Sequence, residues 1–297
     1  MDNKVNHRIV GIGEVLWDIL PDGKKLGGAP ANFVYNVSQF GFPSLVISAV
    51  GDDTLGREAV ALLERRGVDS MLARMPYPTG TVDVSLDGSG VPVYDIKRDV
   101  AWDFIPMGKA LHNLAHEASV VCFGTLAQRN PVSRATINMF LDTMPDGKGR
   151  IKVFDINLRQ GFFDKEVVEQ SLMRCNILKI NDEELVVVNR MLGYGGLELE
   201  HSVSRLRSEY NLDSLILTCG RNGSYIFSKE GKSFIPTPEV KVADTVGAGD
   251  SFTAAFIAGI LKGMPVRDAH RLAVDVSAYV CTCDGAMNEL PPRLLGI

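Results

Sequence analysis

The sequence predicts an α/β fold in which helices cover both faces of a mainly parallel β-sheet. Short runs rich in Val, Ile and Leu alternate with longer helical patterns along the chain, as in consecutive β–α units. The strand-like runs are apolar throughout, so they suit burial from both sides. No internal repeat or low-complexity linker divides the 297 residues, a length that accommodates one large domain or two smaller ones.

The expected elements follow in chain order. A strand at 7–13 precedes a helix at 30–41, and a strand at 44–51 precedes a helix at 54–67. Four further strand-like runs, each followed by a plausible helix, complete the pattern: 119–124, 151–157, 175–181 and 213–220.

Two stretches interrupt this alternation. Residues 14–27 and 80–98 resemble β-hairpins, and the second alternates around the turn residues 87–90. Hairpins inserted into a parallel α/β unit predict a small lid over the ligand-binding edge of the sheet. Two surface hairpins without a functional role would give the same pattern.

Composition and charge narrow the function classes. The chain has 31 Lys and Arg against 36 Asp and Glu, and a surface of this charge repels nucleic-acid phosphates. No apolar run approaches the roughly 20 residues that span a bilayer, and the N-terminus lacks the apolar core of a signal peptide. Five cysteines, an odd number, favour free thiols in a reducing compartment. We therefore expect a cytoplasmic protein that binds neither nucleic acid nor membranes.

The most informative segment is Asp244 to Phe252, which reads DTVGAGDSF. Small residues at 247–249 precede an apolar helix from about Ser251 to Leu261, so backbone N–H groups there can approach an anion closely. Asp250 then lies where it could accept a proton from an attacking hydroxyl. In the alternative interpretation, Asp250 only stabilises the first helical turn and the glycines only form a tight turn.

Two familiar nucleotide motifs are missing. No GxxxxGK[ST] occurs, which excludes a Walker-type enzyme. The run from Gly11 to Leu16 lacks the third glycine of GxGxxG, which weakens a dinucleotide-binding oxidoreductase as the function.

The segment from Gly27 to Asn32 is a second candidate site. Paired glycines leave room for a ligand against the backbone, and Pro30 suits a first helical turn. Asn32 offers both a donor and an acceptor, which suits sugar hydroxyls. A plain strand-to-helix turn explains the segment equally well.

These residues resemble the ribokinase, or PfkB, family of carbohydrate kinases nearly from end to end. The family's C-terminal signature is matched from Asp244 to Phe256. Its N-terminal signature and two weaker motifs also stand in the expected order: Gly28, Asn32, Gly41 and Gly51; Asn181-x-x-Glu184; and Thr218-x-Gly220-x-x-Gly223.

The resemblance implies a single three-layer α/β/α domain over 1–297 with a β-sheet lid, and it implies a role for each motif. Asp250 is expected to be the base, with Gly247, Ala248 and Gly249 forming the anion hole. Asp18, Gly28 and Asn32 are expected to bind the sugar. Further expected ligands are Mg²⁺, organised by Asn181 and Glu184; ATP, bordered by Thr218, Gly220 and Gly223; and K⁺ near Asp244. Family members often pair through their lids, so the resemblance also suggests a homodimer.

The identity of the sugar is argued from two stretches. Residues 13–41 resemble fructokinases more than ribokinases or adenosine kinases. The run from Asp155 to Arg159 resembles the DxNxR stretch of fructokinases and 2-keto-3-deoxygluconate kinases, and Arg159 could reach a polar substrate. Its alternative is a surface salt bridge. We expect a fructokinase-like enzyme; ribose, 2-keto-3-deoxygluconate and nucleosides are alternative substrates, and a sugar-binding regulator without activity is a rival function.

Overall fold

The computed structural model describes residues 7–21, 23–86 and 92–296, which form a nine-stranded sheet and a separate four-stranded sheet. The order of the large sheet is β13-β12-β11-β10-β9-β8-β1-β4-β5. Its strands are β1 (Ile9–Ile12), β4 (Ser44–Gly51), β5 (Asp69–Met75), β8 (Val120–Phe123), β9 (Ile151–Asp155), β10 (Ile177–Asn181), β11 (Ser214–Thr218), β12 (Ser224–Ser228) and β13 (Gly231–Ile235).

The large sheet is parallel from β5 to β11 and ends in an antiparallel edge. The prediction of a helix after 213–220 was wrong. A single 3₁₀ turn, Gly220–Asn222, follows β11, and the chain then returns as β12. Gly220 and Gly223 both adopt positive φ, which reverses the chain too soon for a helix to form.

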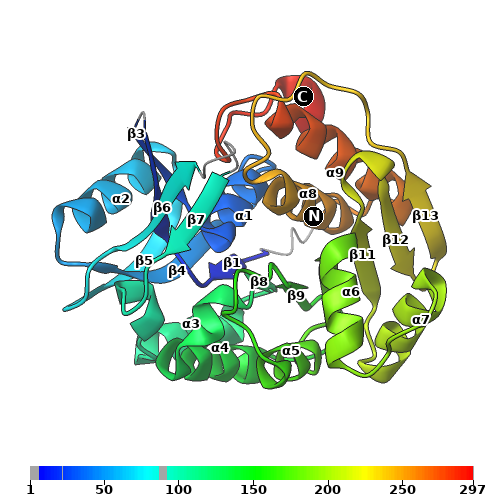
Figure 1. The fold of residues 1–297 in the computed structure, drawn as a ribbon, viewed down its shortest axis with the longest axis horizontal. Coiled ribbons are helices and arrows are strands. Elements are labelled where there is room, and N and C mark those ends of the chain that lie inside the picture. Colours follow the sequence, from blue (N-terminus) through cyan, green and yellow to red (C-terminus); the bar gives the residue numbers. More distant parts are fainter. Residues whose placement is uncertain (1–6, 22, 87–91, 297) are drawn as a thin grey trace, which may run out of the picture.

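Helices cover both faces of the large sheet, as Figure 1 shows, and the three-layer α/β/α prediction is confirmed. Along β1 the side chains alternate between the two cores: Ile9 joins the core under one layer and Val10 the core under the other. One layer contains α1 (Ala29–Ser38), α2 (Thr54–Arg65), α8 (Ala248–Leu261) and α9 (Val266–Cys281). The other contains α3 (Lys109–Glu117), α4 (Pro131–Thr143), α5 (Lys165–Leu172), α6 (Asp182–Met191) and α7 (Leu199–Glu209).

The two predicted hairpins form the small sheet, with strand order β3-β2-β6-β7. Its strands are β2 (Leu16–Leu20), β3 (Gly23–Gly27), β6 (Gly80–Leu86) and β7 (Pro92–Ile96). Each hairpin is antiparallel, and parallel pairing of β2 with β6 joins them. The turn predicted at 87–90 lies outside the described residues.

Helix α8 lies in the most tightly packed part of its layer, between α1 and α9. It is apolar around its whole circumference, and every residue from Ser251 to Gly259 is buried. The helix begins at Ala248, three residues before the predicted start. Gly247 caps it in a left-handed conformation at φ 76°, so the chain enters the helix directly from the glycine-rich turn. None of the helices in the described ranges is long and apolar enough to cross a membrane.

Because α8 depends on burial, truncating its core side chain should be costly. Phe256 is 1% exposed, and Phe256→Ala should lower the free energy of unfolding by about 3–5 kcal/mol, measured by urea denaturation. Met139 on α4 is 48% exposed, and Met139→Ala should change the free energy of unfolding by no more than about 0.5 kcal/mol. Similar losses for the two variants would contradict this packing.

Candidate active site

The candidate site lies at the carboxyl ends of the parallel strands, where α8 begins. A small pocket there is lined by residues of α1, β8, β9 and α8: Ala29, Pro30, Phe33, Cys122, Phe123, Gly124, Asp155 and Asp250. In open α/β sheets this edge is the usual place for a ligand. The structure therefore brings Asp250 and the first turn of α1 together at one pocket, although more than 200 residues separate them in the chain.

Asp250 is held in place by Asn32. The Asn32 amide nitrogen donates to Asp250 Oδ2 at 2.8 Å, and Asn32 is only 3% exposed. Burial and, after it, the negative charge of Asp155 raise the pKa of Asp250 to about 6. The Asn32 hydrogen bond and the positive charges of Lys179 and Arg159 oppose that rise. A carboxylate with this pKa is ionised at neutral pH and can still accept a proton.

Unpaired backbone donors surround the start of α8. In the described part of the chain, no hydrogen-bond acceptor is recorded for the N–H groups of Gly247, Gly249 and Asp250, whereas that of Ala248 points to the Thr245 carbonyl at 3.3 Å. A Cβ at position 247 would lie 2.3 Å from that of Ala286, so only glycine fits there. Free N–H groups at a helix N-terminus, together with the helix dipole, can bind an anion.

A buried ion pair lies beneath this turn. Lys179 Nζ, from β10, is 3.0 Å from Asp155 Oδ1, at the end of β9. The other carboxylate oxygen, Asp155 Oδ2, accepts from the Thr253 hydroxyl of α8 at 3.1 Å. Our sequence reasoning missed Lys179 and Thr253; for Lys179 the available signal was a lysine between the apolar residues of the strand-like run CNILKIN.

The predicted sugar-binding residues gather on the side of the small sheet. Burial raises the pKa of Asp18 to about 6; Asp244 also raises it, whereas Lys25 and Arg159 lower it. Arg159 is exposed, and its charge lowers the pKa of Asp18, Glu14 and Asp250. Within the described ranges the recorded hydrogen bond of Arg159 runs from its guanidinium to the Leu158 carbonyl, at 3.2 Å.

Gly28 and Glu14 pack against each other beside the start of α1. Gly28 adopts φ 113°, and a Cβ there would lie 2.3 Å from the Glu14 carbonyl oxygen, so a side chain is excluded. Glu14 is 3% exposed and accepts from the Ala29 N–H at 3.2 Å, and burial raises its pKa to about 7. We did not predict Glu14 as a site residue; its signal was a glutamate directly after the strand-ending glycine.

On the other side, Asn181 and Glu184 form a capping box at the start of α6. Asn181 Oδ1 accepts from the Glu184 N–H at 2.7 Å, and Glu184 Oε2 accepts from the Asn181 N–H at 2.9 Å. Glu184 Oε1 accepts from the Leu158 N–H at 2.9 Å. The residues that the structure describes include no group of three or more His, Cys, Asp or Glu placed to hold a metal.

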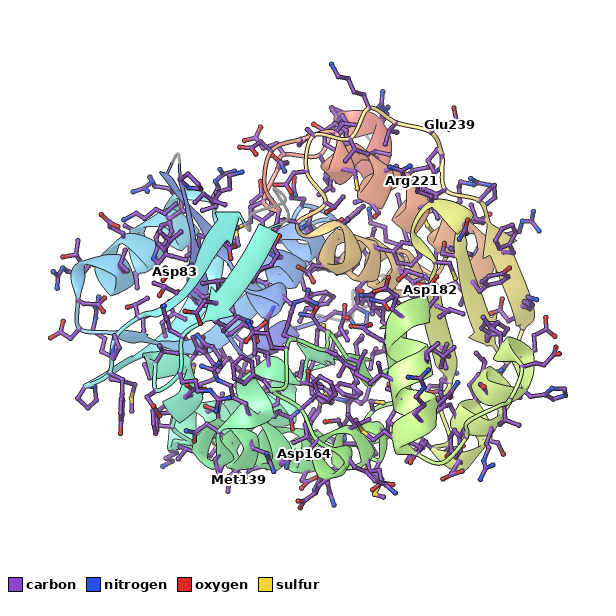
Figure 2. All side chains as sticks on the ribbon, in the orientation of Figure 1. Asp83, Met139, Asp164, Asp182, Arg221 and Glu239 are labelled. Atoms are coloured by element: carbon purple, nitrogen blue, oxygen red, sulfur yellow. The ribbon has the colours of Figure 1, made fainter. Side chains whose placement is uncertain are left out.

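The predicted nucleotide residues lie beside this cap. Thr218 pairs with Asn181 across β11 and β10, and Gly220 and Gly223 form the turn that follows. Figure 2 labels two residues at this edge of the sheet. Asp182 is the first residue of α6, and Arg221 lies in the turn between Gly220 and Gly223.

Asp244 connects the glycine-rich turn to the loop near the C-terminus. Its carboxylate accepts from the N–H groups of Val246 and Gly285 at 3.0 and 3.1 Å. Burial alone would raise the pKa of Asp244, but these hydrogen bonds and Lys25, 3.7 Å away, bring it below its usual value.

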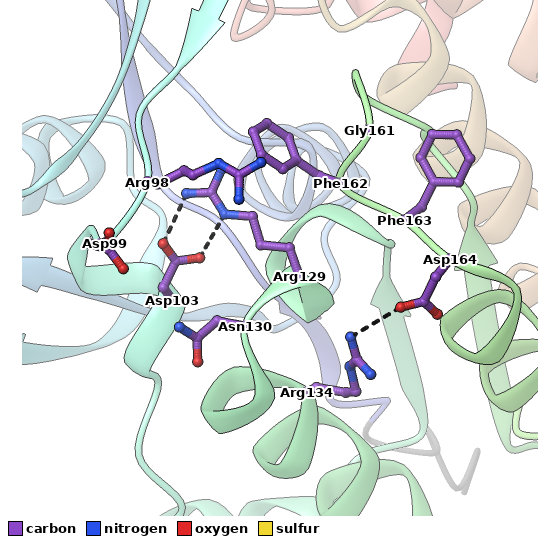
Figure 3. A pocket seen from close by; sticks show the side chains of 10 residues that line it. All are labelled: Arg98, Asp99, Asp103, Arg129, Asn130, Arg134, Gly161, Phe162, Phe163 and Asp164. Atoms are coloured by element: carbon purple, nitrogen blue, oxygen red, sulfur yellow. Dashed lines mark hydrogen bonds and ion pairs between the residues drawn. The ribbon is translucent and has the colours of Figure 1, made fainter.

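A second, larger cavity of about 300 Å³ lies next to the loop after Arg159 (Figure 3). Asp103 binds Arg129 through both carboxylate oxygens, at 2.8 and 2.9 Å, and the Arg98 guanidinium lies over the Phe162 ring. The Gln160 amide donates to the Tyr94 carbonyl of β7, which joins this loop to the small sheet. The lining residues are Arg98, Asp99, Asp103, Arg129, Asn130, Arg134, Gly161, Phe162, Phe163 and Asp164.

Comparison with known proteins agrees with this architecture. The profile of the pfkB family carbohydrate kinases matches residues 22–293. A fructokinase of Klebsiella pneumoniae is 28% identical over 306 residues, covering 97% of each chain. An uncharacterized sugar kinase from Pyrococcus horikoshii, solved in complex with ATP, is 28% identical with a TM-score of 0.78, covering 94% of each chain. A Vibrio cholerae fructokinase bound to fructose, ADP and calcium is 23% identical, with a TM-score of 0.80 over 98% of this chain and 99% of that one, and shows the shared fold.

The hydrogen bond from Asn32 should influence the pKa of Asp250. A hydrogen bond to a charged group contributes about 1.5–3 kcal/mol, so Asn32→Ala should raise the pKa of Asp250 by about one to two pH units. Carboxyl ¹³C NMR titration measures this shift. Ser38→Ala, at the far end of α1, should leave that pKa unchanged. An unchanged pKa in Asn32→Ala would show that the contact does not influence Asp250.

Proposed function

The chain belongs to the pfkB family of carbohydrate kinases and is an ATP-dependent sugar kinase, and we propose that its sugar is D-fructose and its base Asp250. The observation that carries the proposal is the position of Asp250, fixed by Asn32 directly beside the unpaired N–H groups of the α8 turn. This arrangement holds a proton acceptor and an anion site within one turn of helix.

In the proposed reaction, a fructose hydroxyl lies against Asp250 and the γ-phosphate of ATP lies against the anion hole of Gly247, Ala248 and Gly249. The hydroxyl oxygen attacks phosphorus in line, its proton passes to Asp250, and the bond from phosphorus to the β,γ-bridging oxygen breaks. The products are a fructose monophosphate and ADP. Positioning and charge stabilisation account for most of the catalysis in such transfers.

The sugar is proposed to bind between the large and small sheets. Asp18 accepts hydrogen bonds from its hydroxyls, and the Asn32 amide accepts from or donates to them. Gly28 leaves room for the ring, and Arg159 contacts the polar end of the sugar. The opening stretch at 13–41 and the 28% identity to the Klebsiella pneumoniae fructokinase favour fructose over ribose, 2-keto-3-deoxygluconate or a nucleoside. In this proposal the small sheet acts as a lid and is also the surface through which two chains would pair.

ATP is proposed to lie along Thr218, Gly220 and Gly223, with its phosphates toward the α8 turn. Asn181 and Glu184 fit a Mg²⁺ that is held mainly by phosphates and water, because each Glu184 oxygen makes one hydrogen bond and keeps a second lone pair. Such an ion would neutralise phosphate charge. Asp244 is the proposed neighbour of a K⁺ ion.

The proposed location is the cytoplasm, since all five cysteines are free thiols and two of them, Cys122 and Cys175, are buried. A thermal-shift panel of sugars with MgATP or an ATP analogue tests the substrate, because a true ligand stabilises the folded protein by mass action. Fructose should give the largest shift, and a larger shift with another sugar would replace fructose as the substrate.

The role of Asp250 is tested by Asp250→Asn, which keeps the shape of the side chain and removes the base. Its kcat should fall by about 10²–10⁴, whereas the KM values for fructose and ATP should change far less. The melting temperature should shift little, because the introduced amide oxygen can still accept from Asn32 and the charge of a first-turn carboxylate contributes only about 0.3–1 kcal/mol through the helix dipole. If Asp250 only stabilises the helix, stability falls and activity persists. A variant that retains more than about a tenth of the kcat would contradict the role as base.

Arg159 is tested in the same assay. Arg159→Ala should raise the KM for fructose, lower kcat, or both, and leave the KM for ATP nearly unchanged. Arg205→Ala on α7 is the matched control, an exposed arginine paired with Glu209, and should leave all constants unchanged. Unaltered kinetics of Arg159→Ala with every sugar would place Arg159 outside the site.

A further inference from the structure

We propose that Lys179 is a catalytic residue that donates a hydrogen bond to the phosphoryl group as it is transferred. This inference rests on the proposed function and adds a side-chain cation to an anion hole so far made only of backbone. The strand β10 carries Lys179 to the carboxyl edge of the sheet, two residues before the strand ends. Its ammonium group therefore lies under the first turn of α8.

The distance to that turn is short. A Cβ built on Gly249 would lie 2.9 Å from Lys179 Nζ. A Cβ at position 249 would thus displace the ammonium group, the end of a flexible side chain, from its present position. The cation therefore lies beside the first turn of α8, where the N–H groups of Gly249 and Asp250 have no recorded acceptor within the described ranges.

The Lys179 ammonium has more N–H donors than recorded acceptors. Its side chain is 9% exposed, and within the described ranges the ammonium makes one recorded hydrogen bond, to Asp155. An ammonium group carries three N–H donors, so two have no recorded protein acceptor. Buried polar groups in native proteins are nearly always hydrogen-bonded. A phosphate oxygen at the α8 turn would accept from these donors.

The charges around the site require such a cation. Asp155, Glu184 and Asp250 all act on Lys179, and a triphosphate would add further negative charge at the same place. Burial alone would lower the pKa of Lys179, but these carboxylates raise it above its usual value, so the side chain stays charged. Of the two cations that act on Asp250, Arg159 is exposed and Lys179 is buried. A buried cation is screened less and interacts more strongly.

Lys179→Met tests the inference in the full-length protein with MgATP and fructose. Removing one preorganised donor from such a hole typically lowers kcat by about 10²–10³, and we expect that loss with little change in the KM for fructose. A second readout is binding: the affinity for AMP-PNP should fall relative to the affinity for ADP, because only AMP-PNP carries the third phosphate. A purely structural role would leave this ratio unchanged.

Lys152→Met is the matched control. Lys152 is a buried lysine on the adjacent strand β9, paired with Asp146 at 2.7 Å, and it lies at the opposite end of that strand from Asp155. The Lys152→Met variant should keep the wild-type kcat and the wild-type ratio of AMP-PNP to ADP affinity.

Loss of Lys179 leaves Asp155 buried without its partner, which can prevent folding. The comparison of Asp155→Asn with Asp155→Asn/Lys179→Met avoids this, because neither variant has a buried carboxylate at position 155 and the amide oxygen of the single variant can still accept from Lys179. The double variant should be at least tenfold slower than the single one. Equal rates and equal affinity ratios would overturn the role of Lys179. If the wild-type protein is active and Asp250→Asn is not, that result leaves the proposed function intact.

Discussion

The structure depends on how the first turn of α8 is held against the edge of the large sheet. Thr253 of this helix donates to Asp155, Asp155 binds Lys179, and Asn32 of α1 holds Asp250 from the side. These contacts join two helices to two adjacent strands. Because each partner is largely buried, the turn cannot shift without leaving a charge or an amide unpaired, and such groups are costly. The unpaired N–H groups and the carboxylate are thus presented in one orientation.

The same contacts set the charge at the site. Burial favours the neutral form of Asp250, whereas Asn32, Lys179 and Arg159 favour the ionised form, and the balance leaves its pKa at about 6. A more exposed carboxylate would be a weaker base, and one without the cations would have a higher pKa. The packing that buries α8 and the chemistry assigned to Asp250 therefore have a common origin.

Local patterns predicted the layers and most of the residues at the site, and features that depend on three-dimensional register could not be predicted. The strand runs and DTVGAGDSF are continuous in sequence, so they can be recognised without a structure. Lys179 was missed because its role depends on the alignment of β10 with β9 and on the height of α8 above them. The pattern predicts a helix after the strand at 213–220, and the turn at Gly220 to Gly223 replaces it because two positive φ angles are not visible in a pattern of residues. Asn181-x-x-Glu184 is also a capping box, so a single motif serves the helix and the proposed Mg²⁺ together.

The central claim is that Asp250, with a pKa near 6, takes the proton of the attacking hydroxyl. The most direct measurement is the single-turnover rate of phosphoryl transfer between pH 5 and pH 9, with saturating MgATP and fructose. The rate should be level above about pH 7 and should fall about tenfold per pH unit below the pKa, because only the ionised carboxylate accepts the proton. A rate that stays level down to pH 5 would contradict the assignment of Asp250 as the base.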